Sequence, residues 1–217
     1  MVAVAMKPQY GPTLGRLLSP RWRAARPLTR WVLIASGVGL LALAVIAALT
    51  LENARFSHSG RVPFSFSYRG LFRTAPDPGG YVKVQRRRPD GRLEDSFAVG
   101  PLELPPYSGG LSGELPLYAA GYIKGLARRY PQFVPRGEGK TRVNTVPAYN
   151  VFYTVVLEGQ LMYGRDVLLL PERPGVREGV EIVMLSAPRR SAPKLISPTE
   201  VASEGILLRP LKTFTFG

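Results

Sequence analysis

The longest hydrophobic stretch of the chain lies near its amino end. Residues 31–51 read WVLIASGVGLLALAVIAALTL, a run of 21 residues without a charged side chain. At about 1.5 Å per helical residue, this run spans roughly 30 Å, the thickness of a hydrocarbon core. Because a helix closes its backbone hydrogen bonds internally, the pattern predicts one transmembrane helix from Trp31, an aromatic residue suited to the membrane interface, to Leu51.

The residues ahead of this stretch indicate its orientation. The first 30 residues hold no acidic side chain and six basic ones: Lys7, Arg16, Arg21, Arg23, Arg26 and Arg30. Basic residues close to a membrane helix keep their flank in the cytoplasm. We therefore expect residues 1–30 to be a cytoplasmic tail and the chain to be a single-pass protein of the cell membrane whose C-terminal domain is extracytoplasmic. A cleaved signal peptide fits less well, because its apolar core has about 7 to 15 residues.

Beyond the expected juxtamembrane linker, residues 52–61, the pattern becomes that of β-strands. Residues 62–68 (VPFSFSY) alternate apolar and polar side chains, as a half-buried strand does. Two β-like runs flank Pro89-Asp90-Gly91, whose Asp-Gly pair favours a tight hairpin turn. The strands expected from these and later runs are 62–68, 81–88, 92–99, 140–145, 149–157, 161–170 and 180–185, with a second hairpin turn at 158–160.

Two helices are expected among these strands. Residues 100–113 are rich in Pro and Gly and predict a surface loop leading into a helix that begins near 114–116 and stops at Pro131. Its buried stripe recurs at helical spacing: Ala119, Tyr122, Ile123, Leu126 and Tyr130. A second helix is expected from Pro198 to about Leu208, capped by Ser197, before residues 213–216 close the sheet. Residues 62–217 are thus predicted to form one α+β domain, an antiparallel β-sheet with helices packed on it.

The order of these elements resembles that of the PsbP-like α/β/α sandwich superfamily. The resemblance covers roughly residues 62–217 and rests on the lead into the central hairpin, its return strand, a later apolar strand and the C-terminal segment: residues 146–149, 163–165, 182–185, 202–207 and 214–216. The tryptophan that often follows the first strand of such domains is absent, and so is a lipobox cysteine, whose place a transmembrane helix would take. The resemblance implies a non-enzymatic binding or accessory domain without naming a ligand.

The composition limits which kinds of functional site the chain can contain. The absence of cysteine excludes disulfides, thiolate metal sites and a cysteine nucleophile, and the formal net charge of +14 favours anionic surroundings. The run from Val134 to Thr141 lacks the first glycine of a phosphate-binding loop and is followed by β-prone residues. His58, the only histidine, lies next to the expected membrane boundary and is interpreted as solvated, and Glu94 and Asp95 should point to opposite faces of a strand. We expect no enzymatic activity, no cofactor and no metal.

Basic clusters remain as candidate anion-binding residues. Guanidinium groups can hold phosphates or carboxylates through two hydrogen bonds, and the anions near an outward-facing domain are lipid headgroups and envelope polymers. The candidates are Arg86, Arg87, Arg88, Arg128, Arg129, Arg136, Lys140 and Arg142, together with the pair Arg189 and Arg190. The alternative is that these side chains are solvated loop residues.

The sequence supports one leading hypothesis and two alternatives. The leading one is a membrane-anchored extracytoplasmic binding or accessory module of unknown ligand, whose partners are the lipid bilayer, possible anionic headgroups or envelope polymers, and an unknown protein, with no nucleic acid expected. The second is a structural or assembly factor acting through its transmembrane helix, in which Ala35 and Gly39 form a small-xxx-small pair. The third is an envelope hydrolase with an acidic site around Glu158 and Asp166.

Overall fold

The computed structural model describes residues 27–50, 53–105, 111–171, 177–189 and 194–217. The chain divides into two compact units, residues 1–50 and residues 51–217, and each is considered by itself. The tail up to residue 26, Leu51 at the predicted end of the hydrophobic helix, and Arg190 lie outside the described residues.

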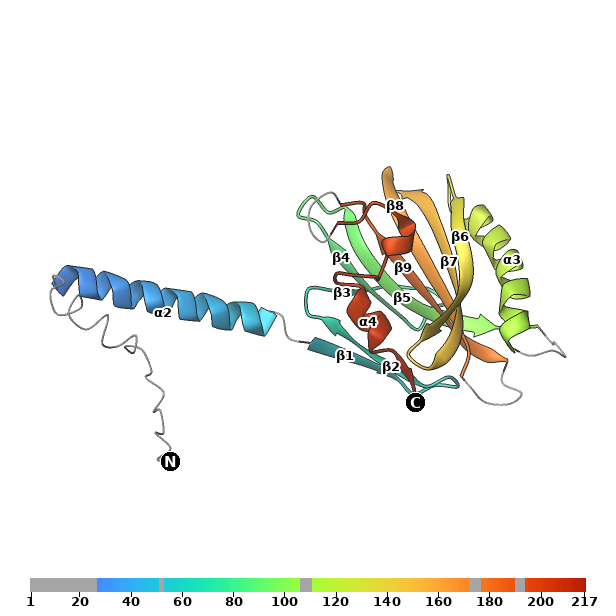
Figure 1. Ribbon diagram of the computed structural model, residues 1–217, viewed down its shortest axis with the longest axis horizontal. Coiled ribbons are helices and arrows are strands. Elements are labelled where there is room, and N and C mark those ends of the chain that lie inside the picture. The colour runs from blue at the N-terminus through green and yellow to red at the C-terminus, as the bar shows by residue number, and fades with distance from the viewer. Residues whose placement is uncertain (1–26, 51–52, 106–110, 172–176, 190–193) are drawn as a thin grey trace, which may run out of the picture. The chain divides into compact units, whose positions relative to one another are not determined.

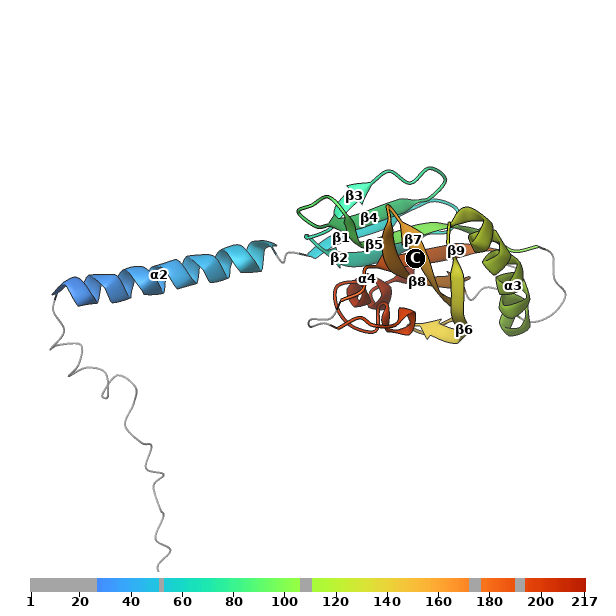
Figure 2. The ribbon, with the colours of Figure 1, turned by 90° about the horizontal axis from the view of Figure 1, so that it is seen from above.

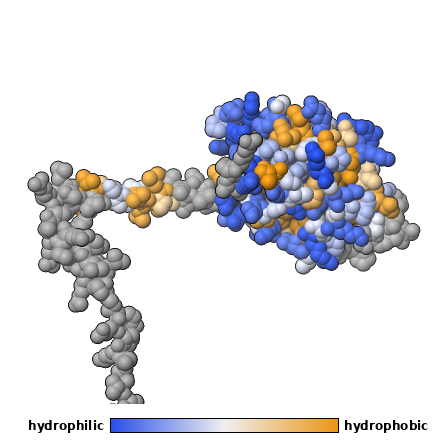
Figure 3. Space-filling view, turned by 45° about the horizontal axis from the view of Figure 1, so that its top comes forward, coloured by the Kyte–Doolittle hydropathy of each residue, from blue (hydrophilic) through white to orange (hydrophobic). Residues whose placement is uncertain are grey.

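The described part of the first unit is one long helix, α2 (Pro27–Thr50), of 24 residues. It covers the predicted hydrophobic segment apart from Leu51. Every side chain described on it is exposed, including Trp31 at 72% and Leu40 at 69%, and hydrophobic residues are visible along it in Figure 3. When the described residues are tested for both length and hydropathy, none of their helices qualifies as a membrane span.

The second unit is built mainly from antiparallel strands (Figure 1). Its strands are β1 (Asn53–His58), β2 (Phe64–Arg69), β3 (Arg73–Ala75), β4 (Val82–Arg87), β5 (Leu93–Glu103), β6 (Val134–Val143), β7 (Val146–Leu157), β8 (Gln160–Leu169), β9 (Glu178–Ser186) and β10 (Thr215–Phe216). Its helices are α3 (Leu111–Arg129), the 3-10 turn η1 (Pro198–Glu200) and α4 (Leu208–Lys212).

These strands form two sheets. The larger has seven strands in the order β3-β4-β5-β9-β8-β7-β6, and the smaller has three in the order β1-β2-β10. The pairings in both are antiparallel. The predicted class, an antiparallel α+β fold with helices on the sheet, is therefore confirmed for this unit.

The two predicted hairpin turns are present. Between β4 and β5, Gly91 adopts φ of 82°, and the Asp90 carboxylate accepts a hydrogen bond from the Arg92 backbone N–H at 3.0 Å. Between β7 and β8, Glu158 and Gly159 have φ of 53° and 71°. Two successive residues with positive φ are what a type I′ hairpin turn requires, and the twist of that turn matches the twist of the paired strands.

The expected linker and the expected Pro/Gly-rich loop are both corrected by the structure. Residues 53–58, inside the predicted linker 52–61, form β1, because their alternate side chains pack against β2. Residues 100–103, inside the predicted loop 100–113, extend β5, which pairs with β9 as far as Glu103. Pro101 lies beyond Val99, where the pairing of β5 with β4 ends, and Pro116 is the sixth residue of α3, which begins at Leu111.

The second predicted helix is also much shorter than expected. Ser197 caps it as predicted, with a capping box to Glu200, but the turn ends after three residues. Ala202 and Gly205 then take φ of 59° and 76°, which no helix accommodates, and α4 follows only at Leu208. Residues 198–208 therefore form an irregular, partly buried segment rather than one continuous helix.

The two faces of the seven-stranded sheet are covered differently. One face packs against the three-stranded sheet and the C-terminal segment and holds an aromatic core in which Phe66 lies 4.9 Å from Phe97 and Phe64 lies 5.4 Å from Phe214, ring centre to ring centre. The Thr213 hydroxyl fixes that segment to β2 by hydrogen bonds with the backbone N–H and C=O of Ser67.

The opposite face carries α3 and is covered in part. The predicted stripe of α3 is confirmed, with Ala119 and Leu126 fully buried and Tyr122, Ile123 and Tyr130 packed beside them. Figures 1 and 2 place α3 next to β6 and β7, on the opposite side of the domain from β3 and β4. The helix therefore leaves the β4, β5 and β9 part of this face without a covering helix among the described residues.

Candidate functional site

The uncovered part of the sheet is the floor of a cleft of about 660 Å³. We call it the α3 cleft. Its wall comes from α3 and the residue after it, its floor from β4, β5 and β9, and its rim from the loop before β4. The lining residues are Asp77, Pro78, Gly79, Gly80, Lys83, Ser96, Ala98, Gly100, Pro101, Tyr118, Tyr122, Arg129, Tyr130, Glu181, Val183 and Leu185.

Small residues on β5 make room for this cleft. Ser96, Ala98 and Gly100 alternate along β5 and so face the same side of the sheet. Gly100 pairs with Glu181 of β9, and a Cβ at Gly100 would lie 3.2 Å from the Glu181 carboxylate oxygen. The glycine therefore allows the Glu181 side chain to lie across the floor.

A buried carboxylate lies behind the wall. Asp166 of β8 is 0% exposed and accepts a hydrogen bond from the Tyr122 hydroxyl at 2.7 Å on Oδ2 and one from the Tyr153 hydroxyl at 2.8 Å on Oδ1. Tyr153 of β7 is itself fully buried, whereas Tyr122 reaches the cleft. One tyrosine hydroxyl thus joins the buried acid to the cleft surface.

Burial perturbs the ionisation of this group. Loss of water raises the pKa of Asp166 to about 7, against the opposing effect of its two tyrosine hydrogen bonds, and the nearby Glu181 raises it further. Burial also raises the pKa of Glu181, while Arg129 and the Tyr122 hydroxyl lower it. The pKa values of Tyr122 and Tyr153 lie well above the ordinary tyrosine value, first because of burial and then because of Asp166. Both hydroxyls therefore keep their protons at neutral pH.

The charges that line the cleft balance. Two lining residues are acidic, Asp77 and Glu181, and two are basic, Lys83 and Arg129. Arg129 and Asp77 each influence the pKa of Glu181, so opposite charges lie close together rather than at separate ends. In a chain of formal charge +14, such a site presents little net field of either sign.

The structure divides the candidate anion-binding residues among three elements. Arg86, Arg87 and Arg88 lie at the end of β4 and the turn after it, Arg128 and Arg129 in the last turn of α3, and Arg136, Lys140 and Arg142 on β6. Of these, Arg129 alone lines the α3 cleft. Whether the others bind anions stays a prediction.

Several of these side chains already have protein partners. Arg86 contacts Asp95 at 2.7 Å, and Arg87 contacts Glu158 at 3.3 Å. Backbone or hydroxyl oxygens accept hydrogen bonds from Arg128, Arg136 and Arg142. Within the described residues, the side chains of Arg88 and Lys140 have no hydrogen bond or ion pair, so these two are the most available to an external anion.

The two acids of the hydrolase alternative, Glu158 and Asp166, lie in different parts of the domain. Glu158 lies in the β7–β8 turn and pairs with Arg87, whereas Asp166 is buried beneath α3, so the two carboxylates have separate surroundings. Glu94 and Asp95 are both reached by the guanidinium of Arg86, where the register between β4 and β5 shifts. Asp95 also accepts hydrogen bonds from Arg189 and Ser186. This second buried acid is therefore neutralised by two arginines and ties strands together.

The interpretation of His58 as a solvated residue is wrong. It lies on β1, and its ring is 4.4 Å from that of Tyr81 and 5.2 Å from that of Phe64. Its Nε2 atom is buried and has no hydrogen-bond partner in the part of the chain that the structure describes. Packing on aromatic rings explains its position. Residues 134–141 lie within β6, so the run resembling a phosphate loop is a strand, as the β-prone residues indicate. The described residues include no group of three or more potential metal ligands.

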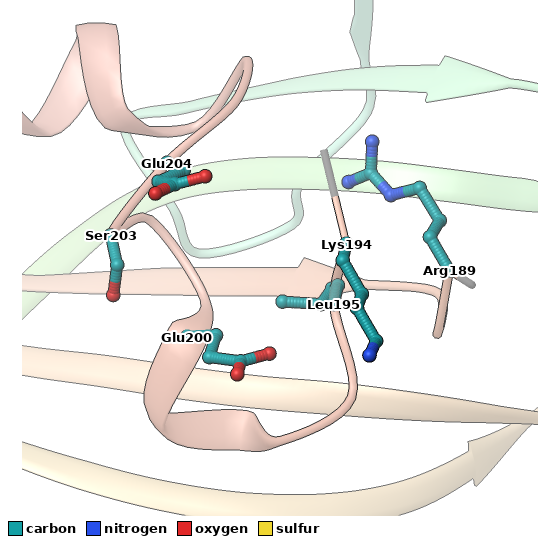
Figure 4. Close-up of a pocket in the computed structure, with 6 residues that line it drawn as sticks. All are labelled: Arg189, Lys194, Leu195, Glu200, Ser203 and Glu204. Carbon is teal, nitrogen blue, oxygen red and sulfur yellow. The ribbon is translucent and has the colours of Figure 1, made fainter. Parts of the chain in front are cut away.

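A second hollow, of about 260 Å³, lies beside η1 (Figure 4). Its charged lining is already engaged in part: Arg189 donates to Asp95 and Ser186, and the Glu200 carboxylate accepts from the backbone N–H groups of Ile196 and Ser197. Figure 4 shows Lys194 and Glu204 as the remaining charged side chains. This hollow is smaller than the α3 cleft and lacks its aromatic wall, so the cleft is the better candidate.

Sequence reasoning named Tyr122 and Tyr130 only as core residues and did not single out Tyr118, Lys83 or Glu181. The sequence did contain one indication that a tyrosine of this helix pairs with a buried acid. A tyrosine in a buried helical stripe must place its hydroxyl on a partner, and Asp166 stands next to the apolar run 167–170, where an acid has to be buried. That Tyr122 and Asp166 form this hydrogen bond depends on how α3 packs over β8, which the sequence does not show.

The similarities of this chain to known proteins lie among solved structures. No family description matches the chain, and neither does any curated protein sequence. Among solved structures, it is similar to the cyanobacterial PsbP of Synechocystis (13% identity, 77% of this chain and 94% of that one, TM-score 0.48) and to the Ran-binding protein Mog1p of Saccharomyces cerevisiae (12%, 76% and 95%, 0.48). LpqN of Mycobacterium tuberculosis, described as involved in cell envelope biogenesis, is a third (10%, 63% and 80%, 0.41).

Proposed function

We propose that this chain is a single-pass, membrane-anchored binding module whose extracytoplasmic domain takes a ligand in the α3 cleft. Support for the anchor comes from the sequence: an uncharged run at residues 31–51 preceded by six basic residues and no acid. The 24-residue length of α2 is sufficient for roughly 36 Å of helix. Support for a binding role comes from the cleft.

The ligand that suits this cleft is a neutral, hydroxyl-rich molecule, and we propose an envelope saccharide. Closely mixed charges favour neither an anion nor a cation. Carboxylates accept hydrogen bonds, guanidinium and ammonium groups donate them, and sugar hydroxyls do both. The rings of Tyr118 and Tyr122, 6.2 Å apart, offer flat apolar surface to a sugar ring. The single observation that carries this proposal is the charge-balanced, tyrosine-walled cleft where α3 leaves the sheet uncovered.

Binding fits the cleft better than hydrolysis. Glycoside hydrolysis uses two carboxyl groups that both reach the substrate, about 5 to 10 Å apart. Asp166 is fully buried behind Tyr122 and does not line the cleft. The expected partner Glu158 is engaged with Arg87. The acids that do line the cleft, Asp77 and Glu181, lie among basic residues, an arrangement suited to hydrogen bonding.

Calorimetric titration of the full chain in detergent tests the ligand class. The probes are neutral, carboxylated and aminated oligosaccharides of equal length. We expect the neutral compound to bind most tightly and Glu181→Gln to weaken it about tenfold, because a charged hydrogen-bond acceptor is worth roughly 1.5 kcal/mol or more. Arg142→Ala on β6 is the matched control outside the cleft. Equal binding of all three probes, or an equal loss in the control, would refute the proposal.

The anchor is tested separately by accessibility. The chain has no cysteine, so Ser203→Cys provides one exposed thiol in the domain. In intact cells, a membrane-impermeant maleimide should label this variant, and alkaline extraction should leave the protein in the membrane fraction. Labelling only after lysis would exclude an extracytoplasmic domain. Replacing residues 31–51 by an unrelated transmembrane segment should keep ligand binding, whereas a loss would favour the assembly role.

A further inference from the structure

We propose that Asp166 is a positioning residue of the α3 cleft: it sets the direction of the Tyr122 hydrogen bond at the cleft surface, so that ligand binding is linked to protonation of the buried acid. This inference rests on the proposed binding function of the cleft and adds its regulation. It concerns a residue that cannot touch the ligand itself, because its side chain is fully buried.

Among the described residues, the hydrogen bond from Tyr122 joins Asp166 to the cleft lining. The Tyr153 hydroxyl donates a hydrogen bond to one carboxylate oxygen from the core side, and the Tyr122 hydroxyl of α3 donates to the other. Tyr122 is also a lining residue of the cleft and lies close enough to Glu181 to affect its ionisation. The order of groups is therefore Tyr153, Asp166, Tyr122 and Glu181, from the core to the ligand surface.

The surroundings of Asp166 contain little compensating charge. The titratable groups that face it are Tyr122, Arg129 and Tyr130 from α3 and its end, Tyr153 from β7, and Glu181 from β9, with Asp77 beyond Glu181. Within the described residues, Asp166 forms no ion pair, in contrast to Asp95 with its two arginines. Hydrogen bonds from two neutral hydroxyls are the direct stabilisation of its ionised form.

A tyrosine hydroxyl has one proton to donate, and this makes the connection directional. When Asp166 is ionised, the Tyr122 proton points to Asp166, and the Tyr122 oxygen can only accept from a ligand or a protonated Glu181. When Asp166 has taken one proton from solvent, its own O–H can donate to the Tyr122 oxygen. The Tyr122 O–H bond can then turn toward Glu181 or the ligand and donate there. The cleft thus gains a hydrogen-bond donor without any movement of the backbone.

The consequence is reciprocal, as linkage requires. A ligand that presents an acceptor to Tyr122 favours the protonated acid, and a ligand that presents a donor favours the ionised acid. Burial places the pKa of Asp166 at about 7, so both forms are populated near neutral pH. The change is therefore available in the ordinary pH range of a cell exterior.

A fluorophore in the cleft tests the connection. Ala98→Cys, on the cleft floor, is the single thiol in a chain without cysteine, and Ser203→Cys, exposed and outside the α3 cleft, is the control. With an environment-sensitive dye on the full chain in detergent, we expect a pH transition near 7 at position 98 and none at position 203. Asp166→Asn should abolish it, and Tyr153→Phe should move its midpoint upward, because one stabilising hydrogen bond is lost.

The decisive variant is Tyr122→Phe, because it leaves Asp166 and its Tyr153 hydrogen bond in place. We expect it to remove at least three quarters of the amplitude at position 98, while circular dichroism shows an intact fold. Loss of the transition in both Tyr122→Phe and Asp166→Asn supports positioning. An unchanged transition in folded Tyr122→Phe, or no transition in the parent protein, would overturn it.

Binding of a neutral oligosaccharide at pH 5.5 and 8.5 then separates the two proposals. If its affinity differs between these values at least threefold in the parent and not in Asp166→Asn, the linkage is supported. Equal affinity at both values in both proteins would overturn the linkage and leave the binding function standing. A persistent transition at position 98 without any saccharide binding would overturn the proposed function and support the internal connection.

Discussion

The two faces of the seven-stranded sheet use aromatic residues in opposite ways. On the face covered by β1, β2 and β10, phenylalanines pack ring against ring, and Phe64, Phe66, Phe97 and Phe214 are each no more than 2% exposed. On the face covered by α3, tyrosines bring hydroxyl groups to a buried carboxylate and to an open cleft. The first face is closed, and the second is left partly open.

This difference separates stability from binding. A phenylalanine contributes by removing apolar surface from water, which requires complete coverage. A tyrosine can be buried at one end and present a hydroxyl at the other, which suits the border between a core and a cleft. We infer that the closed face supplies most of the domain's stability. The open face contributes less, because it keeps polar groups at a cleft where a ligand can reach them.

The largest expected effect comes from the closed face. Phe66→Ala should destabilise the domain by about 3 to 5 kcal/mol, because its ring fills the core between Phe56 and Phe97. Thermal denaturation followed by circular dichroism measures this as a fall in Tm of roughly 10 °C. The matched control is Tyr118→Ala on the half-buried wall of the cleft, for which we expect a loss of about 1 kcal/mol. Similar losses in the two variants would contradict the contrast between the faces.

A second effect is the pH dependence that the buried acid of the open face gives to the free energy of unfolding. The pKa of Asp166 is raised in the folded state, so its stabilising contribution is complete below about pH 4 and is lost as pH rises toward 7. The raised pKa of Glu181 acts in the same direction. The free energy of unfolding should fall by at most about 1.4 kcal/mol per pH unit in this window from Asp166 alone.

Urea denaturation at pH 5 and pH 8 measures this dependence. Asp166→Asn cannot ionise and should flatten the profile, whereas Asp95→Asn, at the acid paired with Arg86 and Arg189, should lower stability without flattening it between these values. An Asp166→Asn profile as steep as that of the parent protein would show that other groups produce the dependence.

The smallest of these effects comes from the close contact between β8 and the Tyr153 ring behind the cleft. Gly164 of β8 lies directly against the ring of Tyr153, and a Cβ there would overlap that ring. Gly164→Ala should therefore cost about 1 to 3 kcal/mol and displace the Tyr153 hydroxyl from Asp166. Gly139→Ala on β6, where a Cβ meets open space, is the control. Chemical denaturation compares the two, and equal stabilities would mean that the Tyr153 ring moves freely.

Local patterns predicted the parts of the fold that depend on neighbours in sequence. Asp90-Gly91 and Glu158-Gly159 predicted their hairpins, because positive φ is required there and few residues supply it. The stripe on α3 was visible because helical spacing brings one side to the core. The missed strand β1 and the broken segment after Ser197 had weak local signals, since their conformation depends on pairing with β2 and packing on the sheet.

The sequence by itself determined the hydrophobic helix over most of residues 31–51, the antiparallel hairpins, the buried side of α3 and the absence of any cysteine chemistry. Only the tertiary structure decided that α3 covers the β6 and β7 side of the sheet and that Asp166, Tyr122, Tyr153 and Glu181 meet at the edge of what it covers. The physical reason is distance along the chain. Periodicity records which side of an element is buried, but the partner that buries it lies tens of residues away and is chosen by the packing of the whole domain.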